Sequence, residues 1–185
     1  MAHVLLGITG SVAAIKTPEL VVSLEADGHT VKLVATDAAT YFFDIAPFRD
    51  RLTLDADEWP GDRYRRGDPV RHIELRKWAD VFVLAPLDAN TLAKLANGLC
   101  DNALTCVWRA WDLSKPVVLA PAMNTLMWQH PFTQKHLETL AAITPRLTVV
   151  SPAEKLLACG DVGVGAMAEL EGIAVAIRRF TLTMQ

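Results

Sequence analysis

Several short segments of the sequence carry side chains that could bind a ligand or move a proton. The first is a turn near the N-terminus, where Gly10 and Ser11 follow an apolar run and precede an amphipathic stretch. A glycine there lets the backbone approach a ligand, and the helix that follows offers free N–H groups to an anion. The segment lacks the G-x-G-x-x-G pattern, which disfavours a dinucleotide. It fits a single phosphate, with Ser11 and Thr36 as hydroxyl donors, or a plain N-cap by Ser11.

Two further segments follow apolar runs that end at proline. In APLDANT, Asp88 or Asn90 could cap the next helix or face a ligand, and taken alone the segment favours capping. In PAMNTLMW, Asn124 offers an amide that can donate to a carboxylate without bringing a charge. Met127 and the neighbouring tryptophan are residue types more often found in a core. The position of this segment just after a strand nevertheless favours a binding site.

A histidine and a cysteine complete the set. His72 lies in RHIELRKW, and histidine is the side chain most often used as a general base. A helix-capping or surface role is the alternative for His72. Cys159 lies in ACGDVGVG, a glycine-rich segment far from the buried role that free cysteines usually have. Such a segment suits a lid that closes over substrate and delivers a proton or a reducing equivalent.

Apolar runs along the chain indicate the scaffold that positions these side chains. Continuous apolar strands separated by helices are typical of a parallel sheet covered on both faces. The fold class is therefore α/β, a doubly wound parallel sheet, whose ligands lie beyond the carboxyl ends of the strands. The sequence predicts strands at 3–9, 30–36, 80–85, 116–120 and 147–150, and helices at 12–26, 89–97 and 173–182.

Two stretches interrupt this alternation. Residues 55–69 are polar and combine proline, glycine and mixed charges, so we expect a long, flexible surface loop. Residues 151–169 carry three glycines between Gly160 and Gly165, too many for a regular element, and we expect a substrate flap over about 152–169. Loops of this length in a compact domain are usually functional or disordered.

Length and composition restrict the class of protein further. The chain has 185 residues, of which 51% are hydrophobic and 21% charged, which predicts one globular domain over 1–185 and excludes intrinsic disorder. The formal net charge of −3 gives no cationic field for nucleic acid. No apolar run approaches the ~20 residues that span a bilayer, so no membrane partner is expected. Three cysteines without a C-x-x-C pairing predict no metal site and a cytoplasmic location.

Four of these segments, in order, resemble the homo-oligomeric flavin-containing cysteine decarboxylases. They are HIELRKWAD, APLDANTLAK, PAMNTLMW and ACGDVGVGAMAE, and the likeness extends from GITGSVA over nearly the whole chain. The resemblance implies a flavodoxin-like fold, an FMN cofactor and oxidative decarboxylation of a C-terminal cysteine unit to an ene-thiol(ate). Oxidation of that unit to a thioaldehyde creates the electron sink that loss of CO2 requires. The resemblance also implies active sites at the contacts of a homotrimer or of a higher assembly of trimers.

Individual roles follow from the same resemblance. His72 and Cys159 correspond to the catalytic histidine and the flap cysteine of the family, and Asn124 to the asparagine that binds the substrate carboxylate. Met127 and Lys77 join Asn124 as expected substrate-binding residues. The expected FMN-binding residues are Gly10, Ser11, Val12, Thr36, Asp88, Ala89, Asn90, Thr91 and Ala122.

The resemblance leaves alternatives for the substrate. Family members that serve coenzyme A biosynthesis often carry arginine where this chain has Lys77, and lysine lacks the planar fork for phosphate. The intact motif around Cys159 favours phosphopantothenoylcysteine, with the product reduced again. The alternative substrate is a precursor peptide ending in cysteine, released as the ene-thiol during modified-peptide biosynthesis. A regulatory flavoprotein is a more distant alternative.

Overall fold

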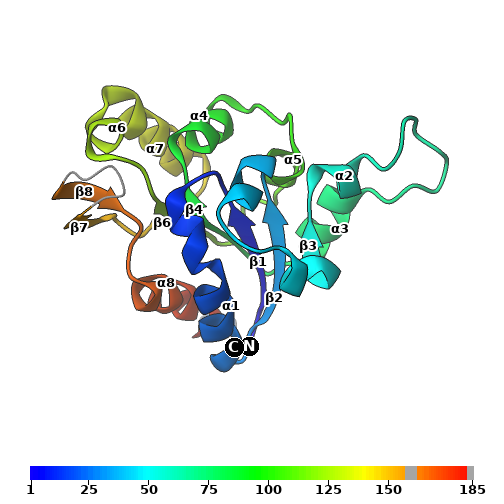
Figure 1. Ribbon diagram of the computed structural model, residues 1–185, viewed down its shortest axis with the longest axis horizontal. Helices are drawn as coiled ribbons and strands as arrows, with labels where there is room; N and C mark the ends of the chain where they lie inside the picture. Colours follow the sequence, from blue (N-terminus) through cyan, green and yellow to red (C-terminus); the bar gives the residue numbers. More distant parts are fainter. Residues whose placement is uncertain (157–161, 183–185) are drawn as a thin grey trace.

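The computed structural model describes residues 1–156 and 162–182, and its centre is a six-stranded sheet in the order β3-β2-β1-β4-β5-β6. Every pair of neighbouring strands is parallel. Apart from the short edge strand β3, the order is the 2-1-3-4-5 of flavodoxin-like sheets, and the predicted α/β class is confirmed (Figure 1). The strands are β1 (His3–Ile8), β2 (Thr30–Ala35), β3 (Leu52–Thr53), β4 (Val81–Leu87), β5 (Val117–Pro121) and β6 (Leu147–Val149).

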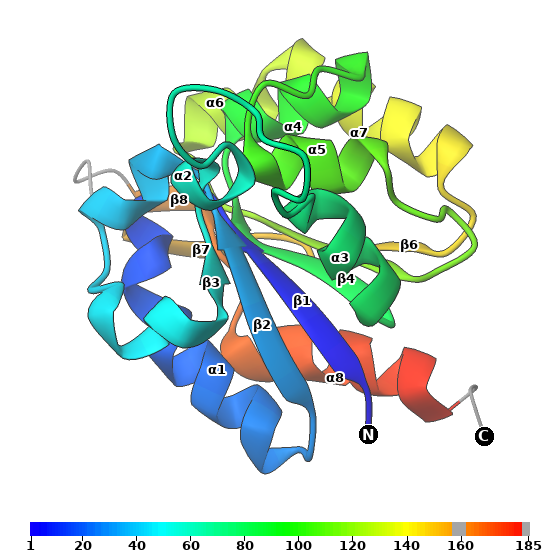
Figure 2. The ribbon, with the colours of Figure 1, turned by 90° about the vertical axis from the view of Figure 1, so that its right-hand side faces the viewer.

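Helices cover both faces of the sheet (Figure 2). On one face lie α1 (Thr17–Ala26) and α8 (Leu170–Leu182), and on the other α3 (Arg71–Trp78), α4 (Ala89–Asn97), α5 (Ala103–Arg109) and α7 (Pro131–Ile143). The short helices are α2 (Asp55–Glu58), α6 (Thr125–Gln129), η1 (Val12–Lys16), η2 (Asp37–Tyr41) and η3 (Ala46–Arg51). Within the described residues, no helix combines the length and the apolar character needed to cross a membrane.

Residues 4–8 of the central strand β1 carry no polar side chain, and all of them are buried. Val4, Leu6 and Ile8 pack into the core cluster that contains α1 and α8. Leu5 points into the other cluster, beneath α4 and α5. Because both faces of the strand are buried, every position favours an apolar side chain, and polar residues do not alternate with apolar ones.

The segment 55–69 is not a loop throughout, which corrects the sequence prediction. It begins with α2, where the Asp57 carboxylate accepts a hydrogen bond from the backbone N–H of Leu54 at 2.8 Å. Glu58, the last residue of α2, is buried. The remaining residues form the long loop that projects beside α2 and α3 (Figure 1). The acidic composition of the segment gave no indication of a helix, because the partners of the helix carboxylates lie elsewhere in the fold.

The glycine-rich segment is also more regular than its composition suggested. Its described residues form an antiparallel hairpin of β7 (Ala153–Leu156) and β8 (Val162–Ala166). The expectation that the glycines exclude a regular element is therefore wrong. A Cβ at Gly163 would overlap the hydroxyl of Thr125, and one at Gly165 would overlap the carbonyl oxygen of Met123. Glycine is needed at both positions because β8 packs closely against the turn before α6.

Candidate active site

The carboxyl ends of β1 and β4 are tied together by the side chain of Thr9. Thr9 is fully buried, and its hydroxyl donates to the carbonyl oxygen of Pro86 at 2.9 Å. The Thr9 hydroxyl oxygen in turn accepts a hydrogen bond from the backbone N–H of Asp88 at 2.7 Å. These bonds join the two strand ends at the point where the strand order reverses, which in such sheets is the usual position of the ligand crevice. No sequence motif indicates Thr9, whose only local signal is its place between the strand and Gly10.

Gly10 lies where three segments converge on this crevice. A Cβ at this position would come 2.7 Å from the Cβ of Ala38 and 3.4 Å from a carboxylate oxygen of Asp88. Glycine is therefore required for the close approach of the backbone, as the sequence predicted. Beside it, Val12 and Ile15 of η1 expose apolar side chains, 45% and 57% accessible. Buried polar groups and exposed apolar side chains thus occur close together along the chain at this edge of the sheet.

Two hydroxyl residues near Gly10 have different surroundings. Ser11 is the N-cap of η1 and accepts a hydrogen bond from the backbone N–H of Ala13 at 3.4 Å, so the capping interpretation is confirmed. Thr36 is buried, and its hydroxyl has no hydrogen-bond partner among the described residues. A buried polar group without a partner costs free energy. The Thr36 hydroxyl can therefore donate to a ligand in the crevice.

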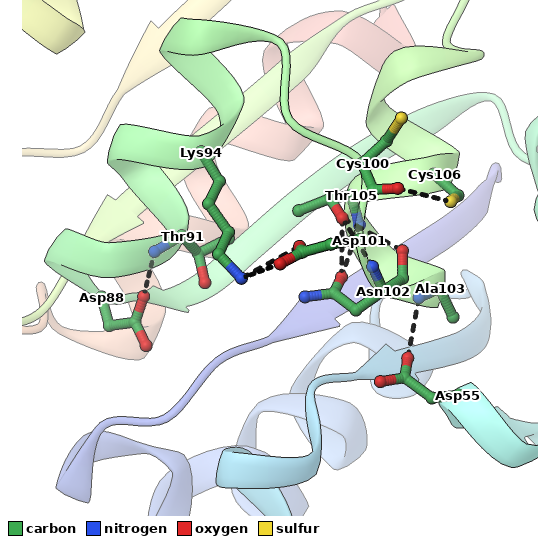
Figure 3. Close-up of polar contacts among 10 residues, drawn as sticks. All are labelled: Asp55, Asp88, Thr91, Lys94, Cys100, Asp101, Asn102, Ala103, Thr105 and Cys106. Atoms are coloured by element: carbon green, nitrogen blue, oxygen red, sulfur yellow. Dashed lines mark hydrogen bonds and ion pairs between the residues drawn. The ribbon is translucent and has the colours of Figure 1, made fainter.

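Asp88 is the N-cap of α4, and its carboxylate accepts a hydrogen bond from the backbone N–H of Thr91 at 2.6 Å (Figure 3). The predicted capping role belongs to Asp88, while Asn90 is exposed in the first turn of α4. Ala122 is buried at the end of β5, and its N–H donates to the carbonyl oxygen of Leu87 at 2.9 Å. The segments after β1, β4 and β5 therefore lie along one edge of the sheet.

A series of polar contacts connects α4 to α5 and α2 (Figure 3). The Lys94 ammonium on α4 binds both carboxylate oxygens of Asp101, at 2.9 and 2.7 Å. Asn102 caps α5, and the N–H of Ala103 donates to Asp55 of α2 at 2.7 Å. Burial raises the pKa of Asp55, and the hydrogen bond from Ala103 opposes that rise. The position of α2 is thus linked to the helix that starts at the crevice.

His72 lies in the first turn of α3 and is held by Glu58. Its backbone N–H donates to one carboxylate oxygen of Glu58 at 2.8 Å, and its Nδ1 lies 2.5 Å from the other. The Glu58 side chain is 5% exposed and the His72 side chain 24%. His72 is therefore neither a helix cap nor a free surface histidine. The sequence analysis missed Glu58 because no spacing rule connects residues 14 positions apart.

Asn124 is the N-cap of α6, and its side-chain oxygen accepts a hydrogen bond from the N–H of Met127 at 2.8 Å. The side chain is exposed, and in the described part of the chain nothing accepts a hydrogen bond from its Nδ2. The turn before it is held by β8, because the N–H of Met123 donates to the carbonyl oxygen of Gly165 at 2.9 Å. A groove of about 300 Å³ adjoins Asn124 and Met127. The amide can thus donate to a ligand there.

The catalytic and substrate-binding residues predicted from the sequence fall into two groups in space. His72 and the exposed Lys77 lie on α3, near the projecting loop, whereas Asn124 and Met127 lie at α6 beside the β7–β8 hairpin. Figures 1 and 2 both show α3 and α6 well apart. Cys159 lies outside the described residues. One chain therefore does not bring the predicted base and the predicted carboxylate ligand together.

The sheet order defines a flavodoxin-like α/β protein, and the point where that order reverses is the usual ligand position of such sheets. The chain belongs to the Flavoprotein family, whose model matches residues 1–182.

Its relatives include the phosphopantothenoylcysteine decarboxylase of Mus musculus, 50% identical over 177 residues that span 95% of this chain and 85% of the relative. A solved cysteine-to-serine mutant of PPC decarboxylase, complexed with pantothenoylaminoethenethiol, has a TM-score of 0.89 at 49% identity and covers 97% of this chain and 98% of its own. The FMN-binding protein AtHal3 has a TM-score of 0.86 at 49% identity, and the match covers 98% of this chain and 97% of AtHal3. The peptidyl-cysteine decarboxylase EpiD is more distant, with a TM-score of 0.75 at 25% identity, and the match covers 95% of this chain and 98% of EpiD.

Proposed function

We propose that this chain is an FMN-dependent decarboxylase that removes the cysteine carboxylate of 4'-phosphopantothenoylcysteine as CO2, a step in coenzyme A biosynthesis. The observation that carries the proposal is identity of 50% to a decarboxylase named for that substrate, over 95% of this chain. The peptide-acting relative is only 25% identical, which favours the small-molecule substrate over a peptide.

The chemistry of the residues at the carboxyl edge fits FMN. The buried Thr36 hydroxyl needs a partner, which a phosphate oxygen would provide, and the exposed Val12 and Ile15 offer an apolar surface to a flat ring. When bound, FMN supplies the two-electron oxidation that makes the cysteine carboxylate able to leave. The residues proposed to hold it are Gly10, Ser11, Val12, Thr36, Asp88, Ala89, Asn90, Thr91 and Ala122.

The proposed substrate residues each have a separate task. His72 accepts the proton of the substrate thiol, because the thiolate is the reactive form. Asn124 donates from Nδ2 to the carboxylate, and a neutral amide orients it without the ion pair that would hinder loss of CO2. Met127 lines the groove beside the amide, and Lys77 provides a positive charge for the phosphate end. Cys159 donates a proton to the ene-thiol, to which the reduced FMN would return the two electrons taken from the substrate, and this gives the saturated product.

These tasks require association of several copies of the chain. Because α3 and α6 lie apart in one protomer (Figure 1), His72 and Lys77 of one protomer meet Asn124 and Met127 of another. A closed homotrimer, or a larger assembly of trimers, provides identical contacts of this kind for every copy.

Mass spectrometry of the products tests the proposal. The purified protein, loaded with FMN, is incubated with phosphopantothenoylcysteine and, separately, with a peptide ending in cysteine. We expect the first to yield phosphopantetheine, lighter by one CO2, and Cys159→Ser to release a product lighter by CO2 and two hydrogens. Turnover of the peptide alone would overturn the choice of substrate. A protein that cannot be loaded with FMN would overturn the activity.

A further inference from the structure

We propose that Glu58 is a positioning residue that holds His72 by its Nδ1 atom and leaves Nε2 as the atom that accepts a proton. The inference rests on the proposed function, in which His72 is the proton acceptor. It concerns a residue outside the set that the sequence motifs indicated, in a segment that the sequence predicted to be a loop.

The two oxygens of the Glu58 carboxylate contact the same residue. One accepts the backbone N–H of His72 at 2.8 Å, which fixes the carboxylate relative to the first turn of α3. The other lies 2.5 Å from Nδ1 of the ring, which fixes the imidazole relative to the carboxylate. An ionised carboxylate only accepts hydrogen bonds, so Nδ1 must carry the hydrogen. In the neutral ring, the free lone pair is then at Nε2.

The carboxylate is itself held rigidly, because α2 is capped at its start and is anchored to other parts of the chain at two points. Asp57 accepts from the backbone N–H of Leu54 at 2.8 Å and binds the Arg49 guanidinium at 2.5 Å. Asp55 accepts from the N–H of Ala103 at the start of α5 at 2.7 Å. With its side chain only 5% exposed, Glu58 has little freedom to leave His72.

Helix α3 is anchored at its other end as well. The Lys115 ammonium donates to the carbonyl oxygens of Arg76 and Ala79 at 3.1 and 2.7 Å. A carboxylate at the N-terminal turn and an ammonium at the C-terminal turn both match the helix dipole. The helix that carries His72 is thus fixed at both ends, and the direction of the ring depends on Glu58.

Glu58→Gln tests this role, because it replaces the carboxylate that orients the histidine with the corresponding amide. Glutamine keeps the size and one acceptor oxygen but adds N–H donors. These donors favour the other neutral tautomer, in which the hydrogen is on Nε2 and Nδ1 is the acceptor. We expect kcat to fall by about 100-fold or more, with KM within about threefold and the bound FMN unchanged. Glu74→Gln is the matched control, because Glu74 lies on the same helix but pairs with Arg71 at the surface at 3.0 Å. It should retain kcat within about threefold of the unaltered enzyme.

Nitrogen-15 NMR of the unaltered protein reads out the tautomer without any substrate. The His72 resonances, assigned by their loss in His72→Asn, should show hydrogen on Nδ1 and a bare Nε2 in the neutral ring. A neutral ring protonated at Nε2 would overturn the proposal, even if Glu58→Gln fails to fold. Turnover of Glu58→Gln equal to that of Glu74→Gln would overturn it too. A protein with the expected tautomer but no decarboxylase activity would instead overturn the proposed function and support the Glu58 contact.

Discussion

At the scale of single residues, Gly10 controls how closely the first turn approaches the rest of the crevice. Replacing it with alanine puts a Cβ 2.7 Å from the Cβ of Ala38, so the turn must move. Overpacking of this kind costs about 1–3 kcal/mol, and we expect Gly10→Ala to weaken FMN binding at least about tenfold. Fluorescence titration of the apoprotein with FMN measures this affinity.

A second glycine provides the control for that substitution. Gly172 lies in α8, and a Cβ there would meet Val150 at an ordinary contact distance of 3.7 Å. Gly172→Ala should keep the affinity for FMN and stabilise the helix by about 0.5–1 kcal/mol. Equal FMN affinity in Gly10→Ala and Gly172→Ala would contradict the assignment of Gly10 to the cofactor site.

The buried side chain of His29 makes the stability of the folded chain depend on pH. Burial is the main cause that lowers its pKa, with the positive N-terminus also lowering it and Asp27 opposing. The folded chain therefore binds a proton at His29 less readily than the unfolded chain, so unfolding takes up protons as the pH falls below the ordinary histidine value of about 6.5. The contribution of His29 to stability is complete above that pH and is lost below it.

Denaturant unfolding at two pH values tests this prediction. Between about pH 7.5 and about pH 5.5, the unaltered protein should lose more free energy of unfolding than His29→Phe, which cannot titrate there. His130→Gln is the control, because His130 is exposed and its loss should leave the pH dependence in place. The same pH dependence in all three proteins would contradict the assignment.

At the scale of secondary-structure elements, the β7–β8 hairpin determines where Asn124 lies. A Cβ at Gly165 would overlap the carbonyl oxygen of Met123, so Gly165→Ala must push β8 away from the turn before α6. Displacement of a positioning group by about 1 Å can reduce a rate about 100-fold. We expect kcat/KM to fall by about tenfold to 100-fold while FMN stays bound. Steady-state kinetics measures kcat/KM, and the flavin absorbance of the same sample measures the bound FMN. Loss of FMN with unchanged kcat/KM per bound flavin would contradict the prediction.

At the scale of the whole molecule, the separation of α3 from α6 predicts that active sites are shared between copies of the chain. His72→Gln and Asn124→Ala should each be inactive alone. When the two variants are co-expressed, about a quarter of the sites combine an intact His72 with an intact Asn124 from different protomers. Activity should therefore return in the mixed assembly, measured on the purified co-expressed protein. No recovery in verified mixed oligomers would place both residues of a site in one chain.

Local patterns in the sequence were sufficient for the scaffold and for some of the site. Apart from the exposed His3, the strands β1, β4 and β5 are continuous apolar runs, and burial on both faces imposes that composition whatever the neighbouring strand is. The cap at Asp88 is equally local, because the carboxylate and the N–H of Thr91 are three residues apart. The order of the motifs along the chain then indicated the family, which the comparison with known proteins confirmed.

The contacts that convert these segments into a site were decided only by the tertiary structure. Thr9 and Pro86 are 77 positions apart, and Glu58 and His72 are 14 apart. The β8 glycines are explained only by the Met123–Thr125 turn that packs against them. Such pairs leave no periodicity in the sequence, because the hydrogen bonds and close contacts between them form only after the sheet and its helices have packed. Side-chain type and local spacing therefore determined which chemistry this protein can do, and three-dimensional packing determined which atoms are placed to do it.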